Sequence, residues 1–185
     1  MKRFIATVLA LALSVSLTAC AGTSSSSTTP KDYTQIIMDT RTDDLNESYA
    51  ITAGQNGEQP TLSLDPNGTD EEQAKSMIEM QMSTLGLPTD DLASLGTYAY
   101  SLSLMNVQAY MVGIFKPASG SEETVRIALE NYLSNLQRSF ENYLPDQYEI
   151  AKAATVETLD DGTIVLVMSE NGADVQSAIV EGLKK

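Results

Sequence analysis

The sequence contains no histidine and no tryptophan, and only one of its 185 residues is a cysteine. Histidine is the side chain that most often acts as a general base near neutral pH and that most often binds zinc. Its absence also excludes catalytic pairs in which a histidine activates a serine or a cysteine. A single cysteine cannot form a disulfide bond within the chain. The commonest forms of nucleophilic and zinc-dependent catalysis are therefore closed to this protein.

Basic residues are also few. The chain has 11 Lys and Arg against 25 Asp and Glu, which gives a formal net charge of −14 at pH 7. Such an acidic surface repels the phosphate backbone of nucleic acids, so we expect no nucleic-acid partner. Hydrophobic residues make up 42% of the chain, which is typical of one globular domain with flanking segments.

Residues 1–19 have the composition of an export signal. Lys2 and Arg3 form a short positive start, and an apolar stretch follows over residues 4–17. This stretch is shorter than the roughly 20 residues that a helix needs to cross a membrane. We therefore interpret residues 1–19 as a cleaved signal peptide.

The signal ends in Leu17-Thr18-Ala19-Cys20, which resembles the bacterial lipobox. The resemblance implies cleavage between Ala19 and Cys20 and attachment of lipid, including palmitate, to the Cys20 thiol. Residues 20–31 are rich in Ser and Thr and are interpreted as a solvated tether. We expect a lipoprotein anchored in the cell membrane on its extracytoplasmic side. The alternative is a secreted protein with an incidental cysteine.

Hydrophobic patterning predicts a lead-in that is partly loop (residues 32–68) and an α+β domain (residues 69–185). Within the lead-in, the pattern favours a short amphipathic helix over residues 33–40 and short strands near residues 49–51 and 61–64. In the domain, the predicted helices are 69–85, 119–144 and 171–183, and the predicted strands are 98–104, 109–115, 155–159 and 163–168. Hairpin turns are predicted at Asn106 and Asp161. We therefore predict one four-stranded antiparallel sheet, built from two ββα units, with helices packed mainly on one face.

Two helix starts have the spacing of capping boxes, at Thr69 with Glu72 and at Ser119 with Glu122. The acidic segment 65–72 also matches part of the pattern of a calcium-binding loop. However, Asp70 stands where an EF-hand requires glycine. A turn followed by a helix cap explains the segment, so we predict no metal site and no cofactor.

Several features together resemble a known family. They are the lipobox and its tether, the helix ending in Leu85-Gly86-Leu87, the strand pair through Met105-Asn106-Val107, the pattern formed by Phe140, Tyr143 and Gln147, and the closing hairpin and helix. The chain resembles a bacterial lipoprotein family of unknown function, domain of unknown function 4358, closely over residues 70–183 and weakly over residues 33–53. The resemblance implies a single domain at the cell envelope. That family has no established activity, so it implies no catalytic or ligand-binding residue.

Tyrosine is the dominant aromatic residue, with eight Tyr against three Phe. Tyr98, Tyr100 and Tyr110 lie on two strands that are predicted to pair. They form either a binding platform for a peptide or a sugar, or a packed layer on the sheet. If helices cover only one face of the sheet, the other face must be polar or bind a partner. These three tyrosines are the candidate binding surface.

We predict that the protein is not an enzyme but a binding or accessory module of the bacterial envelope. Its expected partners are the membrane, through the lipid on Cys20, and an unidentified protein, peptide or envelope ligand. The alternative is a surface protein that binds a small ligand or a cation such as Ca²⁺, suggested by the acidic loops. A third hypothesis is an envelope hydrolase that uses paired carboxylates, which would require two such groups facing each other across a cleft.

Overall fold

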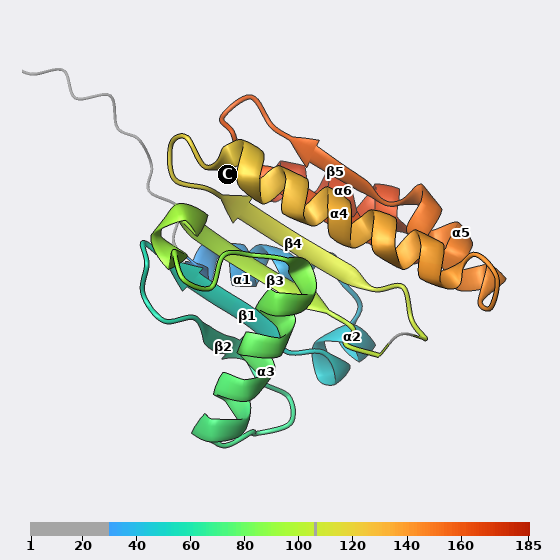
Figure 1. Ribbon diagram of the computed structural model, residues 1–185, viewed down its shortest axis with the longest axis horizontal. Coiled ribbons are helices and arrows are strands. Elements are labelled where there is room, and N and C mark those ends of the chain that lie inside the picture. The colour runs from blue at the N-terminus through green and yellow to red at the C-terminus, as the bar shows by residue number, and fades with distance from the viewer. Residues whose placement is uncertain (1–29, 106) are drawn as a thin grey trace, which may run out of the picture.

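The computed structural model describes residues 30–105 and 107–185, which form one six-stranded antiparallel sheet with helices (Figure 1). The predicted signal peptide, Cys20 and the hairpin residue Asn106 lie outside the described residues. The strands are β1 (Ile51–Gln55), β2 (Thr61–Leu64), β3 (Thr97–Leu102), β4 (Met111–Lys116), β5 (Thr155–Thr158) and β6 (Ile164–Met168). The helices are α1 (Pro30–Thr40), α2 (Asp43–Ser48), α3 (Glu71–Leu85), α4 (Glu122–Phe140), α5 (Pro145–Ala153) and α6 (Gly172–Gly182), with a 3-10 turn η1 (Leu92–Leu95).

The sheet has six strands rather than the predicted four. Its strand order is β2-β1-β3-β4-β6-β5. The two additional strands come from the lead-in, where β1 and β2 form a hairpin and β1 pairs with β3. The α+β class and the antiparallel pairing are confirmed. The lead-in extends the sheet because Ile51 and Ala53 are buried on it.

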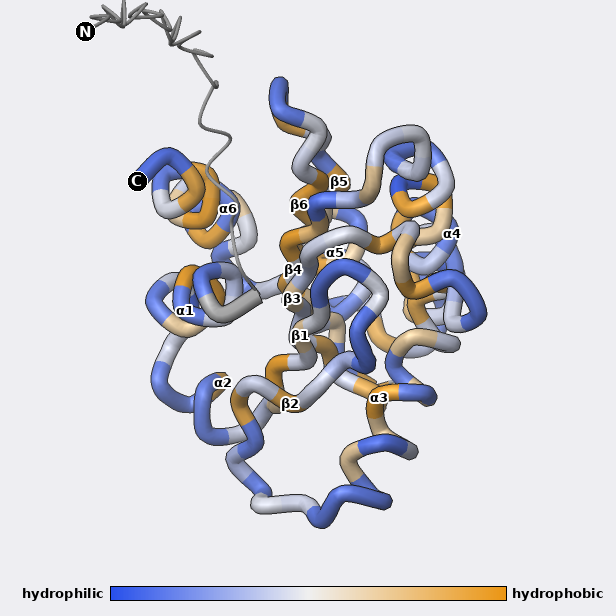
Figure 2. Tube along the Cα trace, turned by 90° about the vertical axis from the view of Figure 1, so that its left-hand side faces the viewer, coloured by the Kyte–Doolittle hydropathy of each residue, from blue (hydrophilic) through white to orange (hydrophobic). Residues whose placement is uncertain are grey.

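Helices cover both faces of the sheet, so the predicted one-sided packing is wrong. Figure 2 shows α1 and α6 on one side of the sheet and α3 and α4 on the other. Every residue of β6 is buried, as are five of the six residues of β4. A strand buried on both sides needs cover on both faces. The lead-in supplies part of that cover through Tyr33 and Ile37 of α1, which are 1% and 0% exposed.

Two hydrophobic clusters lie on opposite faces of the sheet. The cluster under α3 and α4 contains the stacked rings of Tyr98, Tyr100 and Phe115, whose centroids are 5.9–6.2 Å apart. The cluster under α1 and α6 is mainly aliphatic, with Ile37, Ile51, Val112, Ile114, Val165, Val167 and Ile179 among its members. The alternation of side chains along each strand divides the two sets.

Local signals fix several element ends. The turn at Asp161 and Gly162 is confirmed, with Gly162 at φ 83° and the Asp161 carboxylate accepting hydrogen bonds from the backbone and hydroxyl of Thr163. Gly86 ends α3 in the left-handed conformation.

Both predicted capping boxes are wrong. At α3 the N-cap is Asp70, whose carboxylate accepts from the Gln73 N–H at 2.9 Å, while Thr69 donates to Asp65. At α4 the helix begins at Glu122, and the Glu122 carboxylate accepts from the Gly120 N–H. At α3 the Thr69 N–H, which the predicted box pairs with Glu72, instead donates to the Asp65 carboxylate, and at α4 the Glu122 carboxylate bonds to Gly120 rather than to the predicted Ser119.

Candidate functional site

The three tyrosines of the predicted binding surface do not form one surface. Tyr98, Tyr100 and Tyr110 are 1%, 0% and 2% exposed. Tyr98 and Tyr100 belong to the cluster under α3 and α4, whereas Tyr110 belongs to the cluster under α1 and α6. The structure therefore shows the packing alternative, because helices cover both faces of the sheet.

The hydroxyls of Tyr98 and Tyr100 are buried without a hydrogen-bond partner among the described residues. The Thr52 hydroxyl on the same face donates to Gln81 Oε1 at 2.6 Å. Burial raises the pKa of Tyr98 to about 12. Burial, together with repulsion from Tyr98, raises the pKa of Tyr100 even more. Both phenols therefore stay protonated at neutral pH.

One groove lies at the end of the sheet where the turn after α1, the segment before β4 and the turn before α6 meet. We call it the Arg41 groove. Its volume is about 810 Å³. Its walls carry four carboxylates, from Asp39, Asp44, Glu170 and Asp174. The groove surface is therefore acidic even though Arg41 lies in its wall.

Arg41 is 7% exposed and is held almost entirely by neutral groups. Its Nε donates to Asn46 Oδ1 at 2.6 Å, and its Nη2 donates to the Tyr49 carbonyl at 2.8 Å. Its Nη1 donates to the hydroxyls of Ser101 and Tyr110 at 2.8 and 2.9 Å. These bonds use four of its five N–H groups. Arg41 forms no ion pair with any carboxylate in the part of the chain that the structure describes.

Sequence reasoning missed Arg41. The only local signal was a single basic residue in front of the acidic segment 43–47. Its partners Ser101 and Tyr110 lie 60 and 69 residues away in the chain. No spacing rule connects such distant positions, so the cluster becomes visible only in the folded structure.

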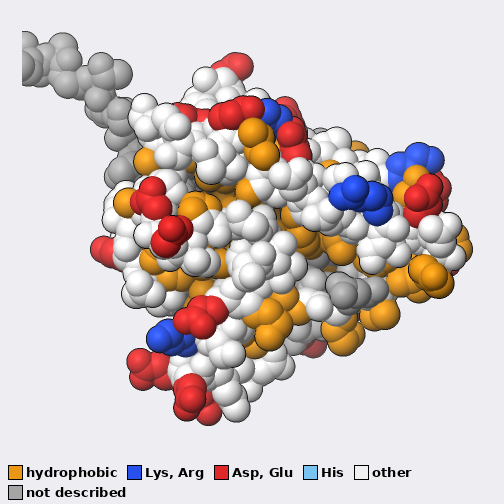
Figure 3. All heavy atoms as spheres, viewed as in Figure 1, with side chains coloured by type: hydrophobic (Ala, Val, Ile, Leu, Met, Phe, Trp, Pro, Cys, Tyr) orange, Lys and Arg blue, Asp and Glu red, His pale blue; other side chains and the backbone are white. Residues whose placement is uncertain are grey.

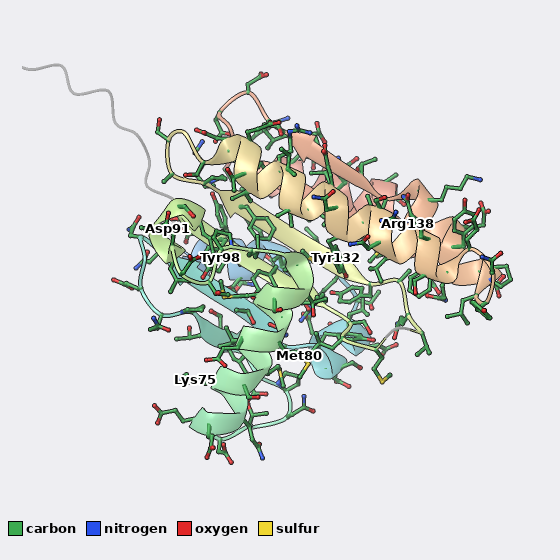
Figure 4. All side chains as sticks on the ribbon, in the orientation of Figure 1. Lys75, Met80, Asp91, Tyr98, Tyr132 and Arg138 are labelled. Carbon is green, nitrogen blue, oxygen red and sulfur yellow. The ribbon has the colours of Figure 1, made fainter. Side chains whose placement is uncertain are left out.

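A second groove lies between β2, α3 and η1, and we call it the β2–α3 groove. Its volume is about 880 Å³. Its apolar lining comes from Leu62 of β2, from Ala74, Ile78 and Met82 of α3, and from Leu92 of η1. Its charged rim consists of Asp65, Glu71, Lys75 and Glu79. Lys75 lies on α3 (Figure 4), and Figure 3 shows acidic side chains gathered around a basic one at that end of the molecule.

The acidic segment that begins at Asp65 is used as a turn. The Asp65 carboxylate accepts hydrogen bonds from the backbone N–H groups of Asn67 and Thr69 and from the Thr69 hydroxyl, at 2.6–3.1 Å. The bond from the Thr69 hydroxyl lowers the pKa of Asp65 below its ordinary value. No group of three or more potential ligands from His, Cys, Asp or Glu is placed to hold a metal within residues 30–105 and 107–185.

Residues 30–105 and 107–185 thus form an antiparallel sheet between two helical layers, with one groove at Arg41 and another between β2 and α3. The chain matches the family Domain of unknown function (DUF4358) over residues 68–169, which is more than half of its length, and so belongs to this family. The matched residues run from α3 to β6. No curated protein and no solved structure matches the chain.

Of the motif residues Phe140, Tyr143 and Gln147, it is Gln147 that joins two segments of the matched region. The side-chain oxygen of Gln147 in α5 accepts a hydrogen bond from the Ala109 N–H at 2.7 Å, which links α5 to the segment before β4. Phe140 is fully buried, whereas Tyr143 is 84% exposed.

Of the helices that the structure describes, none is both long and apolar enough to pass through a bilayer.

Proposed function

We propose that this protein is a lipid-anchored lipoprotein on the extracytoplasmic side of the cell membrane, and that it acts as a non-catalytic binding or accessory module. The observation that carries the proposal is the position of its single cysteine. Cys20 directly follows an export-signal pattern and completes the lipobox Leu17-Thr18-Ala19-Cys20. Two acyl chains on one residue give stable membrane attachment, where a single chain would be marginal.

The fold is compatible with a lipid anchor on the N-terminal side of α1. Helix α1 starts at Pro30, only ten residues after Cys20, and ends next to Arg41. Arg41 bonds to residues at the β3–β4 turn end of the sheet. A helix of this length extends about 15 Å, so Pro30 lies toward the opposite end. An anchor before Pro30 would therefore attach at the end of the sheet opposite the β3–β4 turn and the Arg41 groove.

Palmitate labelling in a bacterial host tests the anchor. We expect label on the wild-type protein and none on Cys20→Ser. The double variant Cys20→Ser/Ser25→Cys is the matched control, because it restores a thiol outside the lipobox, and we expect it to remain unlabelled. Equal label on the wild type and on Cys20→Ser would contradict the proposal.

A second candidate function is the binding of a small cationic ligand at the cell surface. It is supported by the four carboxylates of the Arg41 groove. Since opposite charges attract most strongly in a partly enclosed site, a diamine is a suitable probe, because it needs no cluster of metal ligands. Calorimetry with 1,4-diaminobutane should show heat that is lost in Asp44→Asn/Asp174→Asn. No heat from the diamine at millimolar concentration would dismiss this candidate.

A further inference from the structure

Strand β2 forms an open edge of the sheet. It is the last strand in the sheet order, and among the described strands it pairs with β1 alone. Its sequence TLSL contains no charged residue. At the opposite edge, by contrast, Thr155 and Glu157 of β5 both form side-chain hydrogen bonds with Gln176 of α6. Exposed strand edges are templates for pairing, and charges are a common means of blocking them.

The β2–α3 groove runs beside this open edge. On α3, Ala74, Ile78 and Met82 recur every four residues and form an apolar stripe along the groove, in which Ala74 is half-buried and Ile78 and Met82 form a floor that is 6% and 2% exposed. The helix residues that line the groove extend from Glu71 to Ser83, a length of about 18 Å. This length accommodates about five or six residues of extended chain. Leu62 of β2 supplies an apolar side chain on the opposite wall.

The rim of the groove selects for charge. The rim carries three carboxylates, from Asp65, Glu71 and Glu79, against a single basic residue, Lys75, which lies 3.9 Å from the Glu79 carboxylate. The whole chain has a net charge of −14. Complementary charge accelerates association and suppresses partners of like charge. A second copy of this chain would bring the same acidic rim to the interface, so the charges favour a basic partner over self-association.

We infer that the β2–α3 groove binds an extended basic peptide segment of another protein, which adds a strand to β2 and places alternate apolar side chains on the stripe of α3. Strand addition of this kind derives affinity from backbone hydrogen bonds and specificity from the pockets for alternate side chains. The β1–β2 register is regular where Thr61 and Leu62 pair with Ala53 and Thr52, and it is irregular between Leu62 and Leu64. We therefore expect the added strand to pair along Thr61 and Leu62. The inference names the partner class of the binding module proposed above and rests on that proposal.

Fluorescence anisotropy with the purified full chain tests this inference. The probe is the labelled hexapeptide Lys-Val-Lys-Val-Lys-Val. We expect it to bind, and we expect its Glu-Val and Lys-Gly counterparts to bind at least about tenfold more weakly, a difference of about 1.4 kcal/mol. Methylation of the backbone nitrogens on the pairing edge should also weaken binding at least about tenfold, because it removes the N–H donors.

Two exposed residues of α3 provide matched variants. Glu79 lines the groove and Glu72 does not, although both are exposed on the same helix. We expect Glu79→Lys to weaken binding of the basic peptide about tenfold and Glu72→Lys to change it less than about twofold. Ala74→Arg, which places a bulky cation on the stripe, should abolish binding while circular dichroism remains unchanged. If Ala74→Arg does not fold, the two glutamate variants still decide the question.

Three outcomes would overturn the inference. They are no binding of the basic peptide at millimolar concentration, equal weakening by Glu72→Lys and Glu79→Lys, or a dimer of the wild type that Glu79→Lys changes and Glu72→Lys does not. The last outcome would assign the groove to a second copy of the chain. Peptide binding is measured in solution without a membrane, so its failure is distinguishable from failure of the palmitate labelling.

Discussion

The guanidinium of Arg41 donates a hydrogen bond to the hydroxyl of Tyr110 at 2.9 Å, across 69 residues of sequence. The same nitrogen donates to Ser101 at 2.8 Å. Arg41 therefore joins the turn after α1 to β3 and to the segment directly before β4. Because this charge is buried among neutral acceptors, its contribution to stability depends on the complete set of hydrogen bonds.

Replacement of Arg41 should strongly destabilise the fold. In Arg41→Met, four acceptors lose their donor, and we expect the free energy of unfolding to fall by about 2–4 kcal/mol. Arg41→Lys should rescue little, because an ammonium cannot reproduce the planar fork. Urea denaturation measures both. The exposed Arg138→Met is the control, with an expected change within about 0.5 kcal/mol. Similar losses from the Arg41 and Arg138 variants would contradict the role assigned to Arg41.

The lead-in should contribute to the stability of the whole domain. Ile37 of α1 is 0% exposed, whereas Ile127 of α4 is 43% exposed. We expect Ile37→Ala to lower the free energy of unfolding by about 2–4 kcal/mol and Ile127→Ala to lower it by less than about 1 kcal/mol. Denaturant titrations of both variants check this. If Ile37→Ala cost no more than Ile127→Ala, α1 would not be an integral part of the core.

Gly54 should tolerate no side chain while Tyr98 keeps its position. A Cβ at Gly54 would lie 2.5 Å from the Tyr98 hydroxyl and 2.6 Å from its ring carbon Cζ. We expect Gly54→Ala to destabilise the protein by about 1–3 kcal/mol, because the buried ring must shift.

A double variant tests the cause of that loss. Tyr98→Phe removes a buried hydroxyl that has no partner among the described residues, so it should be nearly neutral alone. In the Gly54→Ala background it should restore part of the lost stability. Gly172→Ala is the matched control, since its Cβ would meet Val167 at an ordinary 3.6 Å. No rescue by Tyr98→Phe would place the strain elsewhere.

Stability should decrease in alkaline solution because of the buried phenols. The pKa of Tyr98 is raised to about 12, whereas an unfolded tyrosine titrates near 10. Between these pH values the unfolded state releases a proton that the folded state retains. Below pH 10 the stability that this group contributes is fully present. As the pH rises from 10 to 12, the free energy of unfolding falls by up to about 1.4 kcal/mol per pH unit for each such group.

Urea denaturation between pH 8 and pH 11.5 measures this slope. Tyr98→Phe should make the decline shallower, while other buried tyrosines continue to contribute. Tyr143→Phe is the control, because this ring is 84% exposed and lies in solvent in both states. An identical slope in the wild type and in Tyr98→Phe would contradict the assignment.

Much of the fold was predictable from local patterns. The period-two alternation of 98–104, the apolar runs at 109–115 and 163–168, and the Asp161-Gly162 turn all correspond to strands and a turn in the structure. The β1–β2 hairpin was largely missed because β2 has only four residues and β1 contains Gly54, a poor strand former that fits beneath Tyr98. The presence of helices on both faces of the sheet could have been predicted from β6. Val165 and Val167 on one face are as apolar as their neighbours on the other face, and a strand that is apolar on both sides needs cover on both.

The candidate sites depended less on local pattern. The tyrosine surface was wrong because its exposure depended on an uncovered sheet face, and α1 covers the face that bears Tyr110. The Arg41 cluster and the β2–α3 groove arise from segments far apart in sequence. The lipidation of Cys20 lies outside the described residues and stays a prediction.

The family match ends at residue 169 and begins at residue 68, but the hydrophobic layer beneath α1 and α6 is completed by residues on both sides of those limits. A protein trimmed to the matched segment for expression would leave Ala99, Val112, Ile114, Val165 and Val167 without their cover. Such an exposed apolar surface promotes aggregation. A stable fragment of this chain therefore includes the flanking helices α1 and α6 in addition to the matched segment.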